Sequence, residues 1–326
     1  MKKQSLLKVS AALGVCCILS LVSSFPLKAA GSTEQGPDSA IARVLEFNVP
    51  PEINRQDQKT VSIDMILTDR DTLTLAEKAY VTLVLRDGTI SRFEGPARVS
   101  LSTAQSHREG NVLAKLTSAI LDLFFSRSDA QEEAYLGVRN PMMAQVRPLR
   151  IPRILYPPPG CNLIIPPRQL RWQPVEGILS YTVSLFDSHQ LLWQGKSNSA
   201  AIELPLADSL VQPGMTYLWV VEAQVGDRAF RSEQAMFSVL DETTVAELNQ
   251  NLSEIDRSIV DPKLSHLLRA KLYRNLNLKL ECYGEVQSLL KMFPADYTAS
   301  IINAELLEEM GLFKEAVEAY RTIVHR

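Results

Sequence analysis

An internal repeat near the end of the chain constrains the fold more than any other feature. Positions about 34 residues apart carry related side chains, and the matched pairs are Ala270 and Ala304, Tyr273 and Leu307, Asn277 and Gly311, Cys282 and Ala316, and Val286 and Tyr320. From Asp241 onward, apolar residues recur at three- and four-residue steps, which is the period of an amphipathic helix. A step of this length is typical of helix pairs that stack on one another. We therefore expect residues 241–326 to form α-helical repeats.

The second copy of the repeat, AELLEEMGLFKEAVEAY, resembles the tetratricopeptide pattern. Ala304 and Ala316 are small where two helices would touch, and Gly311 stands at the turn between them. The first copy has Asn277 in place of the glycine, and asparagine also tolerates the left-handed conformation that such a turn requires. The resemblance implies a tetratricopeptide-like region built of two helix pairs.

Capping residues mark where two of these helices should begin. Asp261 and Pro262 are expected to act as N-cap and first-turn proline of one helix. Thr244 and Glu247 have the spacing of a capping box, so we expect them to cap the helix before it.

The resemblance implies a peptide groove lined by the first helix of each pair, approximately Lys263–Arg274 and Asp296–Met310. Its candidate binding residues are Lys271, Arg274, Glu305, Glu308 and Glu309. This mixed charge suits a short polar peptide. Solenoids usually need about three repeats and a polar cap, so we expect weak binding and weak self-association through the helix Lys314–Val324. The alternative is that this helix face folds back onto the chain's own middle domain.

The N-terminus has the order of a secretory signal. The cationic stretch MKKQSLLK precedes the apolar run VSAALGVCCILSLVSSF, and the small residues KAAGS follow. Residues 1–31 are therefore predicted to be a signal peptide with cleavage near Ala29–Ser32, followed by a flexible segment at 32–42. The alternative is a retained anchor, in which case alone we expect membrane contact. Either way the protein should be exported, either periplasmic or associated with the cell envelope.

Strand-like alternation begins at Arg43 and continues to about Leu101. Val81, Leu83 and Leu85 share one face, and the pair Asp87-Gly88 then predicts a type I′ hairpin turn. Residues 89–93 should return as the partner strand. Farther on, Val112–Phe124 has helical periodicity. We interpret it as a helix covering the β domain, with a membrane-surface or partner-docking helix as the alternative.

The stretch DTLTLAEKAYVTLVLRDGTISRFEGPARVSL resembles the periplasmic module of FecR-like proteins. The resemblance implies a small β domain over residues 43–147. Regulatory members of that family also carry a cytoplasmic domain that holds a sigma factor. Only eight residues precede the apolar segment in this chain, so we expect no such domain here.

A proline-rich segment at 148–167 should be extended, acting as a linker and as the start of the next domain. Strand-like runs about ten residues apart then predict a β-sandwich at 157–240, with Trp172 and Trp219 between its sheets. The stretch LVQPGMTYLWVV resembles the fibronectin type III corner. That resemblance implies a hydrogen bond from the Tyr217 hydroxyl to the preceding backbone.

Neither the composition nor the motifs indicate a nucleic-acid-binding, catalytic or metal-binding site. The net charge of −3 gives no basic surface for nucleic acid. The four histidines lie far apart, and we find no phosphate loop, nucleophile arrangement or zinc spacing. We expect no catalytic, cofactor-binding or metal-binding residues, and so no cofactor. Once the signal segment is removed, only Cys161 and Cys282 remain, either as one disulfide or as two buried thiols.

The sequence thus predicts a multidomain β + α protein with a FecR-like β domain, a fibronectin III-like sandwich and tetratricopeptide-like helices. Our leading hypothesis is a non-catalytic bacterial envelope protein that acts as a protein-interaction scaffold and binds a protein or peptide partner. The alternatives are a FecR-like signalling component that works through a membrane partner, and a glycan-binding module.

Overall fold

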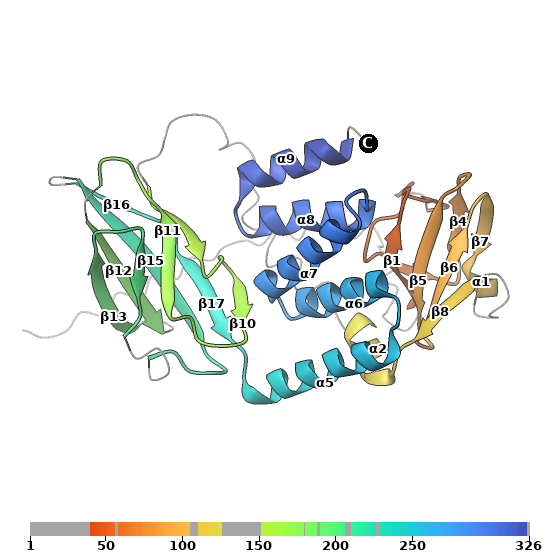
Figure 1. Cartoon of the computed structure of the whole chain (residues 1–326), viewed down its shortest axis with the longest axis horizontal. Coiled ribbons are helices and arrows are strands. Elements are labelled where there is room, and N and C mark those ends of the chain that lie inside the picture. Colours follow the sequence, from red (N-terminus) through yellow and green to blue (C-terminus); the bar gives the residue numbers. More distant parts are fainter. Residues whose placement is uncertain are drawn as a thin grey trace, which may run out of the picture. The chain divides into compact units, whose positions relative to one another are not determined.

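The structure is a computed structural model, and it describes residues 40–55, 58–104, 110–125, 151–178, 180–187, 190–205, 210–225 and 228–324. The predicted signal peptide lies outside the described residues. Several β-sheets are followed by C-terminal helices, so the fold is mixed β and α as expected (Figure 1). No helix within the described ranges has the length and apolarity needed to cross a bilayer.

The N-terminal β region contains two antiparallel sheets, of order β3-β1-β5-β6-β8 and β2-β4-β7. Its elements are β1 (Ala40–Phe47), β2 (Glu52–Ile53), β3 (Ile66–Thr68), β4 (Thr72–Leu75), β5 (Tyr80–Leu85), β6 (Thr89–Glu94), β7 (Ala97–Ser100), the short helix α1 (Leu101–Ala104) and β8 (Asn111–Lys115). Leu73 and Val99 of the small sheet share one buried core with Val81 and Leu83 of the large sheet. β1 already begins at Ala40, inside the segment predicted to be flexible.

The predicted hairpin is confirmed, because β5 and β6 pair antiparallel on either side of Asp87-Gly88. The predicted type I′ turn is wrong. That turn needs positive φ at both central residues, and here Gly88 alone has it, at 85°. The Asp87 carboxylate instead accepts a hydrogen bond from the Thr89 amide (2.8 Å). Glycine is required at position 88, since a Cβ there would lie 2.6 Å from the Leu116 carbonyl oxygen.

The helix predicted over Val112–Phe124 is only half right. Residues 111–115 form β8, which pairs with β6, and the helix α2 (Ser118–Phe125) begins after it. Val112 and Leu113, which we had placed in the helix, are exposed on this strand. Pairing gives the β6 backbone hydrogen-bond partners that an open edge would lack. The expected covering role does hold for α2, whose Ile120 is buried with Val84 and Ile90 of the sheet.

The middle region forms two further sheets, of order β10-β17-β15-β12-β13, with β16 also paired to β15, and β14-β11-β9. Their strands are β9 (Arg153–Tyr156), β10 (Cys161–Leu163), β11 (Gln169–Gln173), β12 (Tyr181–Asp187), β13 (Gln190–Ser197), β14 (Ala201–Glu203), β15 (Thr216–Val225), β16 (Arg228–Arg231) and β17 (Ala235–Val239). β10 pairs parallel to β17, and the other described pairs here are antiparallel. Trp172 and Trp219 fill the shared core, as predicted. The Tyr217 hydroxyl meets the preceding backbone, accepting from the Gln212 amide (2.8 Å).

The C-terminal region consists of antiparallel helices, drawn in blue in Figure 1. They are α5 (Glu242–Ser258), α6 (Pro262–Asn275), α7 (Lys279–Met292), α8 (Tyr297–Glu309) and α9 (Phe313–Val324). Asp261 caps α6 as predicted, accepting from the Lys263 and Leu264 amides (2.8 and 3.1 Å). The predicted capping box of α5 is wrong, since Asp241 is its N-cap and accepts from the Thr244 amide (2.8 Å).

Both turns of the repeat adopt the left-handed conformation that its sequence indicates. Asn277 lies between α6 and α7 with φ 54°, and Gly311 lies between α8 and α9 with φ 75°. The helix contacts are made by small side chains, and Ala270, Ala304, Cys282 and Ala316 are all buried.

One hydrophobic cluster joins the N-terminal sheet to the helices. Leu45 and Val84 of the sheet belong to the same buried cluster as Leu248 of α5 and Leu268 of α6. The sheet face opposite its own core is therefore covered by α2, α5 and α6. This contact brings residues about 200 positions apart in the sequence into one core, and it lies where the peptide groove was predicted.

Candidate functional site

Three of the five predicted groove residues lie together. Arg274, on α6, forms ion pairs with Glu305 (2.7 Å) and Glu309 (3.0 Å), both on α8. Burial alone would lower the pKa of Arg274, but the two carboxylates raise it above its ordinary value. These charges thus bind one another across the helix pair.

Glu308 lies one turn from this cluster and faces α9. It is exposed, and it accepts a hydrogen bond from the Tyr320 hydroxyl (3.2 Å). Partial burial, with Glu308 and Glu305 nearby, raises the pKa of Tyr320 to about 12. Tyr320 therefore keeps its proton and acts as the donor at neutral pH.

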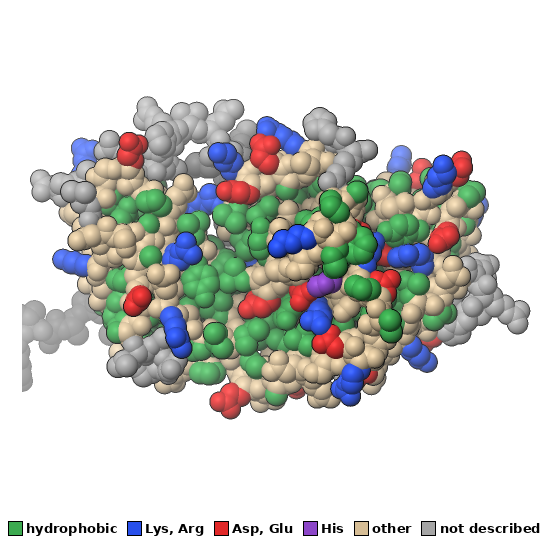
Figure 2. Space-filling model, viewed as in Figure 1, with side chains coloured by type: hydrophobic (Ala, Val, Ile, Leu, Met, Phe, Trp, Pro, Cys, Tyr) green, Lys and Arg blue, Asp and Glu red, His purple; other side chains and the backbone are tan. Residues whose placement is uncertain are grey.

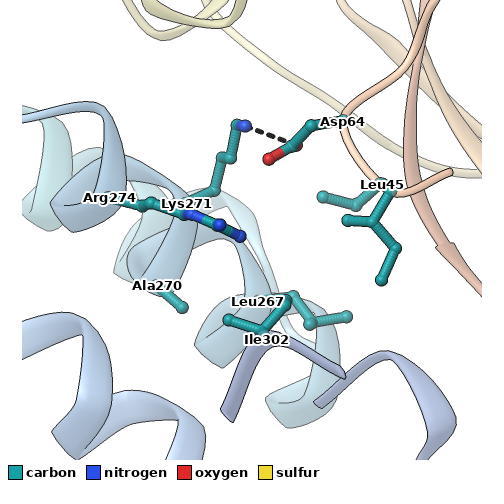
Figure 3. Close-up of a pocket in the computed structure, with 8 residues that line it drawn as sticks. Leu45, Asp64, Leu267, Ala270, Lys271, Arg274 and Ile302 are labelled. Carbon is teal, nitrogen blue, oxygen red and sulfur yellow. Dashed lines mark ion pairs between the residues drawn. The ribbon is translucent and has the colours of Figure 1, made fainter. Parts of the chain in front are cut away.

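Lys271 points toward the N-terminal β region instead of toward solvent. It forms an ion pair with Asp64, in the loop that precedes β3 (Figure 3). Burial lowers the pKa of Lys271 to about 8, against the opposing effect of Asp64. Burial would raise the pKa of Asp64, but Lys271, Arg274 and Arg43 together bring it below its ordinary value. The pair is therefore charged at neutral pH in spite of its burial.

The space beside this ion pair is too small for a ligand. Figure 3 shows its lining, which comes from both regions: Leu45, Ile63, Asp64, Leu267, Ala270, Lys271, Arg274 and Ile302. The cavity measures about 10 Å³, which is the room of a single water. The groove is thus closed at this point by the chain itself.

Farther along the groove, α8 meets the end of β1. The Thr298 hydroxyl accepts from the Phe47 amide (3.2 Å) and donates to the Phe47 carbonyl (3.0 Å). It satisfies both backbone groups, as the backbone of a neighbouring strand would. The ring of Phe47 also packs against Tyr297, with ring centroids 5.8 Å apart.

An ionic network completes this contact. Lys263, in the first turn of α6, pairs with Glu46 of β1 (2.6 Å) and with Asp296 at the N-cap of α8 (2.7 Å). It also donates to the hydroxyl of Tyr80 (2.9 Å). Burial would lower the pKa of Lys263, yet these partners raise it. Glu46 further pairs with Arg92 (2.5 Å).

The sequence placed Lys271 and Arg274 in the predicted groove, but it did not predict that other residues of the chain occupy the same place. Asp64 offered one signal, because it is a charge inside the apolar run of KTVSIDMIL. Glu46 and Thr298 offered no such signal, since each matches an ordinary exposed position of its element. Their partners across the contact, Lys263 for Glu46 and Phe47 for Thr298, lie 217 and 251 residues away, beyond any local pattern.

The two cysteines that the structure describes form no disulfide. Cys161 and Cys282 are free and buried, and burial raises the pKa of each thiol to about 12. Among the side chains that the structure describes, no group of three or more His, Cys, Asp or Glu is placed to hold a metal ion.

Beyond the filled groove, α9 carries an apolar stripe that remains exposed. Phe313, Val317 and Tyr320 follow one another at four- and three-residue steps, with exposed fractions of 60%, 47% and 36%. Beside this stripe, α9 packs inward through Ala316, which is buried. Searches against models of known protein families and against curated proteins gave no match.

Proposed function

We propose that the chain is an exported, non-catalytic bacterial envelope protein that acts as a protein-interaction scaffold. One contrast supports the proposal most. Four of the five charged residues predicted to bind a peptide are already in ion pairs within the chain, whereas the apolar stripe of α9 is exposed. Exposed apolar surface beside a packed array of helices is typical of a protein-binding face.

The proposal includes the three resemblances. The N-terminal sheets are taken as FecR-like, the middle sheets as fibronectin III-like and the helices as tetratricopeptide-like. The Tyr217 hydrogen bond favours the second, and the left-handed turns at Asn277 and Gly311 favour the third. We do not extend the proposal to glycans, since glycan binding would need a row of exposed aromatic rings, whereas Trp172 and Trp219 are buried and Trp193 is half-buried.

The non-catalytic part of the proposal rests on access. Lys271 is buried and the side chain of Asp64 is 25% exposed, and both have shifted pKa values of the kind that often marks active sites. The cavity beside them holds no more than a water, so it has no room for a substrate. Burial accounts for the lowered pKa of Lys271, and the neighbouring cations account for the lowered pKa of Asp64.

A site-specific crosslinker tests the scaffold. A photoreactive phenylalanine analogue at position 313 should give adducts with an envelope protein in intact cells. The same analogue at Thr322, also exposed on α9 but off the stripe, is the matched control. Equal yields at both positions would contradict the proposal.

Export is tested separately. Cell fractionation and mass spectrometry of the mature N-terminus should find the protein outside the cytoplasm, cleaved near Ala29–Ser32. An intact N-terminus in the membrane fraction would favour the retained anchor instead.

A further inference from the structure

The repeat itself shows what kind of element covers a stripe such as that of α9. Thirty-four positions before Phe313, Val317 and Tyr320 stand Lys279, Tyr283 and Val286 on α7. Val286 is fully buried, where Tyr320 is 36% exposed. The corresponding side of one helix is thus covered, and that of the other is open.

The element that covers α7 is α8. Val286 and Tyr283 belong to the same hydrophobic cluster as Ala299, Ile302 and Leu306 of α8. Lys279 donates to the backbone carbonyl of Glu309, at the end of α8 (3.0 Å). Gln287 donates to Asn303 across the same contact (2.7 Å). A helix with a small and aliphatic face therefore fits this surface.

Charged residues beside the two stripes indicate which charge a covering helix should carry. Arg274 lies beside the covered stripe, and it pairs with Glu305 and Glu309 of the covering helix. Thirty-four positions later the chain has Glu308, which is exposed and of opposite sign. A helix that covers the α9 stripe in the same way would place two of its residues, one turn apart, next to the Glu308 carboxylate. Basic residues at those two positions of the covering helix would be favourable.

We propose that the α9 stripe docks an amphipathic helix of another protein, with a small and aliphatic face and a basic residue opposite Glu308. This inference rests on the proposed scaffold function and names the chemistry of its partner. The patch is small, so we expect dissociation constants of roughly 10 μM to 1 mM.

A second copy of the chain fits this surface less well. Its α8 face is already packed on α7, so the helix surface that would match the stripe is its own α9 stripe. In an antiparallel pair of α9 helices, the flanking residues Lys314 and Arg321 would face their counterparts. Like charges at these positions disfavour the pairing.

Two labelled, helix-stapled peptides test the proposal with the full chain. One has the α8 sequence, residues 296–310, and the other has it with Glu305→Lys and Glu309→Lys. Fluorescence anisotropy should show that the wild-type protein binds the lysine peptide about fivefold more tightly than the native one. Glu308→Arg recreates the charge of Arg274, so this variant should prefer the native peptide instead. Val317→Asp should abolish binding of both, with helix content unchanged by circular dichroism.

Each other outcome has a defined meaning. Absence of binding, unchanged binding to Val317→Asp, or a preference that Glu308→Arg does not invert would overturn the proposal. A wild-type dimer that Val317→Asp dissociates, shown by light scattering, would overturn it in favour of a second copy. If the peptides behave as expected but crosslinking at position 313 captures no envelope protein, the helix site stands and the scaffold function fails.

Discussion

Lys271 is the residue whose environment differs most from what the sequence indicates. Its position on a predicted groove helix indicates a binding residue that faces solvent, yet the ammonium group of Lys271 is buried against Asp64. A buried ion pair adds little net stability, since desolvation offsets much of the attraction. Removal of one partner should nevertheless be costly, because it leaves the other charged and unpaired.

The lowered pKa of Lys271 predicts a pH dependence. Between pH 8 and about 10.4, the unfolded chain holds a proton on this lysine that the folded chain has released. The free energy of unfolding should therefore gain a positive contribution from Lys271 as pH rises through this window. The raised pKa of Lys263 removes stability only at higher pH.

Urea unfolding of wild type and Lys271→Met at pH 7.5, 8.5 and 9.5 measures this contribution as a difference. The titrations of cysteine and tyrosine contribute to the free energy of unfolding of both proteins, so their contributions cancel in the difference. We expect the stability of wild type to rise relative to the variant across the series. Parallel profiles would mean that Lys271 is not held at a lowered pKa.

Asn277 gives a second test at the scale of the residue. Its φ of 54° is unfavourable for a residue with a Cβ, by roughly 1–2 kcal/mol. Its side chain also donates to the Gly160 carbonyl. Asn277→Ala and Asn277→Gly both lose this bond, but only alanine carries the strain. We expect Asn277→Ala to be less stable than Asn277→Gly by about 1 kcal/mol. Equal midpoints of the two variants in thermal unfolding would contradict this.

Among the helices and strands, several local signals were confirmed, although the type I′ turn at Asp87-Gly88 and the capping box of α5 were wrong. The cap at Asp261, the left-handed turns and the strand faces around Trp172 all follow from side chains near in sequence. The segment at 111–125 was misread because its division into strand and helix depends on an open edge of β6. The contents of the groove were missed for the same reason, since Asp64 and Phe47 reach it only through the tertiary fold.

The contact between β1 and α8 predicts a sensitivity to one hydroxyl. Thr298→Val keeps the shape of the side chain but leaves the buried amide and carbonyl of Phe47 without this partner. We expect a loss of about 1–3 kcal/mol in the free energy of unfolding. Thr298→Ser retains the hydroxyl, so its free energy of unfolding should fall by less than that of Thr298→Val. Thr322→Val, on the exposed side of α9, is the matched control and should change stability by no more than about 0.5 kcal/mol.

At the scale of the whole molecule, the helices hold the N-terminal β region in the place where a peptide was expected. The shared core of Leu45, Val84, Leu248 and Leu268 and the network around Lys263 belong to one packed contact. Most of the groove surface is therefore structural. The outer side of α9 keeps an exposed apolar stripe, and the proposed function is centred there.

Separate expression of the two parts tests whether the helices bind the N-terminal β region. Residues 40–125, with an affinity tag, are produced together with residues 151–326, so that no covalent link joins the β region to the helices. We predict that the two fragments purify as a stoichiometric complex and that Leu268→Asp, at the centre of the shared core, abolishes their association. Two folded fragments that elute apart by size-exclusion chromatography would contradict the claim that the chain fills its own groove.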